Sequence, residues 1–304
     1  MRRTMTGVIF LLILLPALGG SGDACAQSGW FWQNPLPQGN NLYGVWFTDA
    51  VMGTAVGSEG TILRTTNGGT SWTLQMSGTT DHLYAVSFTD AHTGTAVGSA
   101  GAILRTTNGG ANWAIQTSGT TNYLYAVSFT DANTGTAVGS GGTILRTTDG
   151  GSIWTPQMSG MTRWLNGVSF TDANTGTVVG DVGAILRTTD GGTSWTPQMS
   201  GTPGNLLGVS FTDINTGTAV GSGGRILRTT NGGTNWTPQT SGTTNDLYAV
   251  SFTNATTGTA AGEGGTILRT TNGGSSWTPQ TGGTSHPLHD VCFTDGNRGT
   301  AVGS

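Results

Sequence analysis

Apolar and polar positions follow one another in short runs that repeat along the chain with a fixed period. Aromatic residues mark this period most clearly, because tryptophans and phenylalanines both recur every 41 residues. The tryptophans are Trp72, Trp113, Trp154, Trp195, Trp236 and Trp277, and the phenylalanines are Phe47, Phe88, Phe129, Phe170, Phe211, Phe252 and Phe293. A strict period of this length indicates a repeat architecture in which neighbouring units share a core.

Each repeat contains four short segments that favour β-strand. In one repeat they cover residues 124–129, 136–139, 143–148 and 154–158, with glycine, asparagine and aspartate clusters between them. The 3.6-residue periodicity of an amphipathic helix is absent. Four strands in about 40 residues are typical of one blade of a β-propeller.

The sequence therefore predicts an all-β fold, a seven-bladed β-propeller of four-stranded antiparallel blades. Six complete repeats precede a partial seventh, which stops at Ser304 after its second strand. Trp30 and Gln33 reproduce the spacing of Trp72 and Gln75, so we expect the N-terminal region to supply the fourth strand of a closing blade shared by both termini. The third strand of that blade is missing from the pattern. Either the sequence is a fragment, or the closing blade is incomplete and has three strands.

Residues 1–26 have the features of a secretory signal peptide. Two arginines precede an apolar segment, residues 8–18, that is too short to span a membrane comfortably, and an A-x-A cleavage site ends at Ala26. The mature chain, residues 27–304, is then a single propeller domain without a transmembrane segment. We expect a secreted or periplasmic monomer. Lipid attachment at Cys25 is an alternative that fits the preceding residues poorly.

The charge of the mature chain argues against a nucleic-acid partner. The full sequence has 11 basic and 15 acidic residues and no lysine, and removal of the signal peptide leaves 9 arginines against 14 acidic groups. Binding to nucleic acid requires a basic surface that displaces phosphate counterions, and no basic stripe is present. Glycine is abundant, with 53 residues, but the regular apolar positions exclude a disordered linker.

A second motif recurs between the third and fourth strand of each repeat. It reads TTNGGTSW at residues 65–72 and TTDGGSIW at residues 147–154. A short polar side chain at its third position can bond the amides of its own turn, and the glycines allow a positive φ. The final tryptophan can pack as an apolar plug. We expect structural roles for these tryptophans and for the third-position residues Asn67, Asn108, Asp149, Asp190, Asn231 and Asn272.

This motif resembles the Asp-box of sialidases, xyloglucan-degrading glycosidases and sortilin-type receptors. The fuller pattern, L-x-x-V-x-F-T-D-x-x-x-G-T-A-V-G-x-x-G-x-I-L-R-T-T-[ND]-G-G-x-x-W, is most similar to the photosystem II stability/assembly factor family and its non-photosynthetic bacterial relatives. The resemblance covers essentially the whole mature chain. It implies a seven-bladed, non-catalytic propeller that binds protein, and it requires no cofactor.

Recognition is expected where the repeat loses its regularity. In a propeller the innermost strand comes first, so the Asp-box turns lie on one face and the blade-to-blade loops on the other. Variable residues on that second face are candidates for binding a protein or a glycan. They are Arg163, Trp164, Tyr123, His82, Asp81, Glu59, Asp181, Arg225, Glu263 and Asp246. Arg163 and Trp164 are the strongest candidates, because arginine and tryptophan often anchor interfaces.

Two further sets of residues occupy equivalent positions in successive repeats. We call each such set a column, and both columns suggest contacts within the scaffold. An arginine recurs just before each Asp-box, as in Arg64, and an aspartate recurs after the first strand, as in Asp49. Both approach the same face, so we expect Arg–Asp pairs that stabilise the blades, with an arginine ring that binds an anion as the alternative.

The case for an enzyme is weaker. A sialidase needs three substrate-gripping arginines and a tyrosine/glutamate nucleophile pair, and the sequence offers neither. Another glycosidase would need two carboxylates about 5–10 Å apart, which Glu59, Asp81, Asp181 and Glu263 could supply from different blades. No metal is expected, because only His286 and His289 are close in sequence. Cys292 stands where other repeats have serine and is expected to be a small buried residue.

Overall fold

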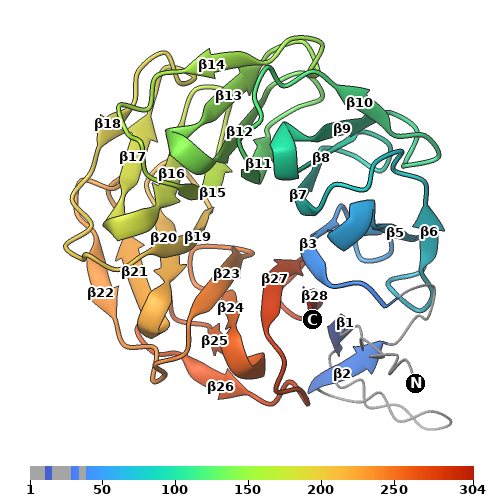
Figure 1. The fold of residues 1–304 in the computed structure, drawn as a ribbon. Coiled ribbons are helices and arrows are strands. Elements are labelled where there is room, and N and C mark those ends of the chain that lie inside the picture. Colours follow the sequence, from blue (N-terminus) through green and yellow to red (C-terminus); the bar gives the residue numbers. More distant parts are fainter. Residues whose placement is uncertain (1–10, 16–28, 34–38) are drawn as a thin grey trace, which may run out of the picture.

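The computed structural model describes residues 11–15, 29–33 and 39–304. In these residues every sheet has four antiparallel strands, and the sheets stand around a central channel as a ring (Figure 1). The innermost strand of each repeat-built sheet is its first in sequence, and the fourth lies at the rim. The predicted all-β propeller with four-stranded antiparallel blades is confirmed.

Six blades are each built from one contiguous repeat. Blade 1 has β3 (Leu42–Phe47), β4 (Gly53–Gly57), η1 (Ser58–Gly60), β5 (Ile62–Thr65) and β6 (Thr73–Gln75), and blade 2 has β7 (Leu83–Phe88), β8 (Gly94–Gly98), η2 (Ser99–Gly101), β9 (Ile103–Thr106) and β10 (Ala114–Gln116). Blade 3 has β11 (Leu124–Phe129), β12 (Gly135–Gly139), η3 (Ser140–Gly142), β13 (Ile144–Thr147) and β14 (Thr155–Gln157). These bounds agree closely with the four segments predicted from sequence.

The remaining repeats follow the same order. Blade 4 has β15 (Leu165–Phe170), β16 (Gly176–Gly180), η4 (Asp181–Gly183), β17 (Ile185–Thr188) and β18 (Thr196–Pro197). Blade 5 has β19 (Leu206–Phe211), β20 (Gly217–Gly221), η5 (Ser222–Gly224), β21 (Arg225–Thr229) and β22 (Thr237–Gln239). Blade 6 has β23 (Leu247–Phe252), β24 (Gly258–Gly262), η6 (Glu263–Gly265), β25 (Ile267–Thr270) and β26 (Thr278–Gln280).

A composite sheet completes the ring in the order β27, β28, β1, β2. Its strands are β27 (Leu288–Phe293), β28 (Gly299–Gly303), β1 (Leu11–Leu15) and β2 (Gly29–Gln33). The sequence predicted seven blades, whereas the structure has six that are each built from one repeat, and the last repeat contributes only two strands to the composite sheet. The expected absence of a third strand is wrong, since β1 pairs with both β28 and β2. The rest of the predicted signal peptide lies outside the described residues.

The hydrophobic core lies between neighbouring blades. At the junction of blades 1 and 2, Val56 and Ile62 of one blade pack with Leu83, Val86 and Leu104 of the next, all of them buried. The same grouping recurs around the ring. A blade therefore hides its apolar surface only when its neighbour is present.

The arginine column joins adjacent blades and does not pair with the aspartates. Arg64 Nη1 donates to the hydroxyl of Thr54 at 2.8 Å, and Nη2 donates to the carbonyl of Ala91 in the next blade at 2.7 Å. The guanidinium also stacks on the ring of Phe88, 5.0 Å from its centroid. The predicted Arg–Asp pairs are wrong, and burial of the guanidinium also excludes the alternative anion site.

The aspartate column has a local role. Asp49 Oδ1 accepts hydrogen bonds from the amides of Val51 and Met52, at 2.7 and 2.8 Å, and so closes its own turn. Among the described residues the one ion pair is Arg298–Asp295, at 3.9 Å on the surface. A carboxylate that already accepts two backbone amides in an exposed turn gains little from a distant cation.

The Asp-box turns cap themselves, as predicted. In blade 3, Asp149 Oδ1 accepts from the amide of Ile153 at 3.0 Å, and the hydroxyl of Thr147 accepts from the amide of Gly151 at 2.8 Å. Gly150 and Gly151 have φ of 72° and 86°, which other residues rarely adopt. Trp154 is buried against the edge of Phe129, with ring centroids 5.9 Å apart. We call this side of the ring the Asp-box face.

Candidate functional site

The opposite side of the ring carries the η turns and the blade-to-blade loops, and we call it the variable-loop face. The two kinds of loop are tied together, since the amide of Ser58 in η1 donates to the carbonyl of Asn41 at 2.9 Å. The ten variable residues predicted from sequence all belong to these loops or adjoin them. The structure separates them into residues that hold loops in place and residues that remain exposed.

Three of the predicted residues hold loops in place, and two of them, His82 and Asp246, join loops of neighbouring blades. His82 Nδ1 accepts from the amide of Glu59 at 3.1 Å, and Asp246 Oδ1 accepts from the amide of Gly223 at 2.8 Å. Asp81 accepts from the hydroxyl groups of Thr79 and Ser99 at 3.1 and 3.4 Å. Their side chains therefore have a structural role in shaping this face.

Three other predicted residues bond within or between loops of blades 4 to 6. Asp181 Oδ1 accepts from the Asn166 amide group at 3.0 Å, and Arg225 donates to the carbonyl of Ser222 at 2.9 Å. Glu263 accepts from the backbone of Asp246 at 3.4 Å. These charged residues are distributed over three blades, and the structure does not gather them into one catalytic cluster.

The central feature of the variable-loop face is a continuous row of aromatic rings, which we call the aromatic arc. It runs through Tyr248, His289, Tyr43, Tyr84, Tyr125 and Trp164. Successive ring centroids are 5.7, 5.3, 5.7, 5.7 and 5.7 Å apart. The arc follows the mouth of the channel because its first five members occupy the second position of successive inner strands.

Two more rings widen the arc on its outer side. His82 lies 6.3 Å from Tyr43, and Tyr123 lies 6.3 Å from Tyr84, both measured between centroids. Tyr123 and Trp164 are about half exposed, at 47% and 52%. Burial raises the pKa of Tyr84, so this phenol stays neutral and able to donate a hydrogen bond. The result is an accessible surface of stacked rings with polar edges.

Blade 4 departs most from the repeat on this face. Trp164 and Arg163 stand in its entry loop, and η4 contains Val182 with φ of 56°. Glu59 in η1 and Ala100 in η2 share this left-handed backbone, and η3, η5 and η6 have glycine there. A β-branched residue in the left-handed region is unusual and strained. Val182 is also exposed. Strain of this kind tends to accumulate at functional sites, and here it is next to the end of the aromatic arc.

The channel below the arc has a volume of about 530 Å³ and contains a polar departure from the repeat. Asp290 replaces the alanine or glycine of other inner strands, and its carboxylate accepts from the amides of Val45 and Val291, both at 2.8 Å. Although it faces the channel, protein encloses it closely, and burial raises the pKa of Asp290 to about 7.

Cys292 takes the place of the serine column in the same strand. Its sulfur accepts from the amide of Phe47 at 3.3 Å, as Ser251 Oγ accepts from the amide of Phe293 at 3.1 Å. Burial raises the pKa of the Cys292 thiol to about 12, which disfavours the nucleophilic thiolate. The expected structural role of this residue agrees with its contacts.

In the described part of the chain, no group of three or more His, Cys, Asp or Glu side chains is arranged to hold a metal ion. The same residues include no helix long and apolar enough to cross a membrane.

Sequence reasoning missed most of the aromatic arc. It selected Trp164, Tyr123 and His82 from the loops, but it assigned no role to the tyrosines of the inner strands. The available signal was the column Tyr43, Tyr84, Tyr125 and Tyr248, which places a large amphipathic ring at the same point of four strands. A residue that recurs at the channel mouth can be part of the repeat and still be only partly buried.

Comparison with known proteins agrees with this architecture. Two solved structures match nearly the whole chain: YCF48 from Cyanidioschyzon merolae, at 22% identity, and a structure described as YCF48 bound to D1 peptide, at 20%. Their TM-scores are 0.72 and 0.74, and the matches cover 89% of this chain and 94% and 91% of theirs. A GH74 xyloglucanase from Xanthomonas campestris matches at 15% identity, with a TM-score of 0.71, over 87% of this chain and 51% of its own. At these identities the structures show a shared fold.

The family comparison is more specific. A search of curated proteins found no match. The family model described as photosynthesis system II assembly factor YCF48 matches four overlapping segments, residues 24–115, 74–155, 115–236 and 200–287. Together they cover the six repeats almost completely. The chain therefore belongs to the family of the photosynthesis system II assembly factor YCF48.

Proposed function

We propose that the chain is a non-catalytic scaffold that binds a segment of a partner protein on its aromatic arc. The observation that carries this proposal is the unbroken row of six rings at the channel mouth, ending in the exposed Trp164. Tyrosine and tryptophan offer a large contact area for little loss of side-chain entropy, and interface hot spots are rich in them.

Family membership supports a protein partner. One solved YCF48 structure is described as bound to a D1 peptide, so at least one protein of this fold and family holds a peptide. The aromatic arc is narrow and curved, and its polar edges can bond a peptide backbone. We therefore propose an extended peptide segment as the ligand. We also propose that β27 and β28 act as the inner strands of a seventh blade, which closes the ring beneath the arc.

A glycan is the second candidate, because sugar rings also stack on aromatic side chains. The likeness to the xyloglucanase concerns the fold alone and does not favour hydrolysis. Glu59 and Glu263 lie on η1 and η6, and the one carboxyl with a strongly raised pKa, Asp290, is held by two backbone amides. We therefore place glycan binding, without turnover, as the alternative.

Peptide and glycan arrays with the purified chain test the proposal. We expect peptide binding that Trp164→Ala weakens by about tenfold or more, the usual loss at an aromatic hot spot. Ile153→Ala is the matched control, because Ile153 is an exposed apolar residue of the Asp-box face. Binding to glycans only would favour the alternative. Equal binding by Trp164→Ala and wild type would remove the arc as the site.

We further propose that the chain is exported, on the basis of the N-terminal sequence. Cleavage after Ala26 would take β1 with it and leave β28 paired only to β27. N-terminal sequencing of the protein recovered from culture medium or periplasm tests this, and we expect the mature chain to begin at Gln27. Recovery of an intact N-terminus would refute cleavage and make β1 a permanent strand.

A further inference from the structure

The outermost strands of the six repeat-built blades fall into two groups. β14, β18, β22 and β26 contain a proline at their second position, whereas β6 and β10 contain Leu74 and Ile115 there. The prolines are Pro156, Pro197, Pro238 and Pro279. Proline removes a hydrogen-bond donor from an edge strand and so discourages the addition of another strand. Blades 1 and 2 lack this protection.

The backbone of Ile115 faces away from its own sheet. In blade 4 the amide of Gln198, the residue after the proline, donates to Ile185 at 2.9 Å, so the proline nitrogen must face outward. Gln116 pairs with Ile103 in the same register, which turns the N–H and C=O of Ile115 toward the rim. Within the described residues β10 is the last strand of its sheet. One donor and one acceptor are thus presented at an open edge.

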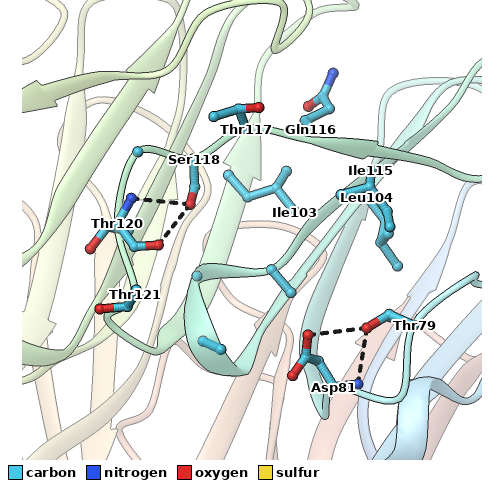
Figure 2. Close-up of a pocket in the computed structure, with 14 residues that line it drawn as sticks. Thr79, Asp81, Ile103, Leu104, Ile115, Gln116, Thr117, Ser118, Thr120 and Thr121 are labelled. Carbon is cyan, nitrogen blue, oxygen red and sulfur yellow. Dashed lines mark hydrogen bonds between the residues drawn. The ribbon is translucent and has the colours of Figure 1, made fainter.

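A pocket of about 710 Å³ lies beside this edge (Figure 2). Ile103, Leu104 and Ile115 line it together with Thr79 and Asp81, but Ile103 and Leu104 are almost fully buried. Ile115 is 68% exposed, an unusual value for an isoleucine in a strand. The pocket therefore combines an unprotected strand, one exposed apolar side chain and a carboxylate.

The same chain contains a matched pocket with a closed edge. In blade 5 an equivalent cavity of about 840 Å³ is lined by Ile226, Leu227 and Pro238. Ile226, Leu227 and Pro238 lie three repeats after Ile103, Leu104 and Ile115, so Pro238 takes the position of Ile115. The two cavities share these lining positions but differ in the availability of a backbone donor and in charge, because Asp81 lines the first and Arg225 the second.

We propose that β10 is a strand-addition site, where an extended segment of a partner protein pairs with the backbone of Ile115 and places an apolar side chain in the adjacent pocket. This site is distinct from the aromatic arc and does not depend on it. Strand addition provides affinity through main-chain bonds and specificity through pockets for alternate side chains.

The shape of the rim selects a flexible segment over a second copy of this chain. Both rims are convex, so two copies would touch along strands of three residues and bury far less than the ~1,000 Å² that a specific interface needs. A convex rim also cannot enter a recessed pocket. An extended segment can pair with β10 and also place a side chain in the pocket. A basic or hydroxyl residue in that segment would meet Asp81.

A short synthetic peptide that alternates valine and threonine and carries one lysine is the probe. Amide hydrogen exchange of the full chain, followed by NMR, reports its position. We expect protection of the Ile115 amide on peptide addition and no change in β22. No protection at millimolar peptide would overturn the proposal.

Ile115→Pro tests the backbone bonds directly, since four blades already fold with proline at this position. We expect the affinity for the probe to fall by up to about tenfold, because the outward N–H of residue 115 is lost while its carbonyl remains. Pro238→Ile is the converse variant and should create peptide-induced protection in β22. An Ile115→Pro protein that binds the probe as wild type does would refute strand addition.

A modified peptide keeps the test independent of protein folding. The probe with N-methyl groups on all its backbone amides retains its side chains but cannot donate to a strand edge. We expect it to bind wild type at least about tenfold more weakly than the parent probe. Equal binding by the two peptides would show that side chains alone carry the contact and would overturn the proposal.

Discussion

The two faces of the ring are made from the same repeats, yet they use polar side chains differently. On the Asp-box face, the side chains of Asp149 and Thr147 are fully engaged by amides of their own turn. On the variable-loop face, the rings of Tyr123 and Trp164 lie half exposed beside other rings. The difference indicates that the most regular motif is occupied with structure, whereas the accessible chemistry gathers where the repeat varies.

Two tryptophans ten residues apart give the largest contrast between the faces. Trp154 is 5% exposed, so Trp154→Ala should lower the free energy of unfolding by about 3–5 kcal/mol through lost burial and a cavity. Trp164→Ala should lower it by less than about 1 kcal/mol, as usual for an exposed site. Urea unfolding of both variants measures this. Similar losses would show that the arc is part of the core.

The channel carboxyl should make stability depend on pH. Because burial raises the pKa of Asp290 to about 7 from an ordinary 3.8, the folded protein holds a proton that the unfolded chain releases. The free energy of unfolding should therefore fall by about 2–4 kcal/mol as pH rises from about 4 to above 7. Asp290→Asn should remove this fall. An unchanged pH profile in denaturant titrations of the variant would contradict the assignment.

The arginine column should tolerate no replacement by lysine. In Arg146→Lys the single ammonium cannot bond both Thr136 and the carbonyl of Ala173 while it stacks on Phe170. We expect a loss of roughly 1–3 kcal/mol in the free energy of unfolding. The same measurement on Arg163→Lys, at an exposed loop position, serves as the control and should show almost no change.

The smallest effect is expected inside the Asp-box itself. Hydrogen bonds from Ser194 hold the pKa of Asp190 down at about 2, so its stabilising contribution is present above the ordinary pKa and lost as pH falls toward 2. Four boxes carry asparagine, so Asp190→Asn should leave the thermal midpoint at neutral pH nearly unchanged. Below about pH 4 the variant should lose less stability than wild type. A large drop at neutral pH would mean that the charge matters.

Much of the fold could be predicted from the sequence because the information is repeated and local. The strand segments, the self-capping turn at Asp149 and the identity of the inner strand each follow from short-range patterns. The arginine contacts could not be predicted in this way. Arg64 reaches Thr54 in its own blade and Ala91 in the next, and only the twist between blades decides whether those groups or Asp49 lie within reach.

The sequence predicted some members of the candidate site and not others. Loss of regularity pointed to the variable-loop face and to Trp164, which lies at the end of the aromatic arc. The tyrosines of the arc were missed, since a pattern of alternating positions does not show which inner-strand residues face open space at the channel mouth. The third strand of the composite sheet was missed because residues 11–15 have the composition of a signal peptide and none of the repeat motif.

Several side chains that recur in the repeats bond the blade that follows their own. Arg64 bonds a residue in the following blade, and so do Gln75 and Ser87 through Gly109 and Phe129. A chain synthesised from its N-terminus must therefore leave each newly made blade unfinished until the next one emerges. Because the repeats are nearly identical, a blade that meets the wrong neighbour would find the same contacts. Orderly emergence and a final ring-closing step would then decide whether the chain reaches its proper shape.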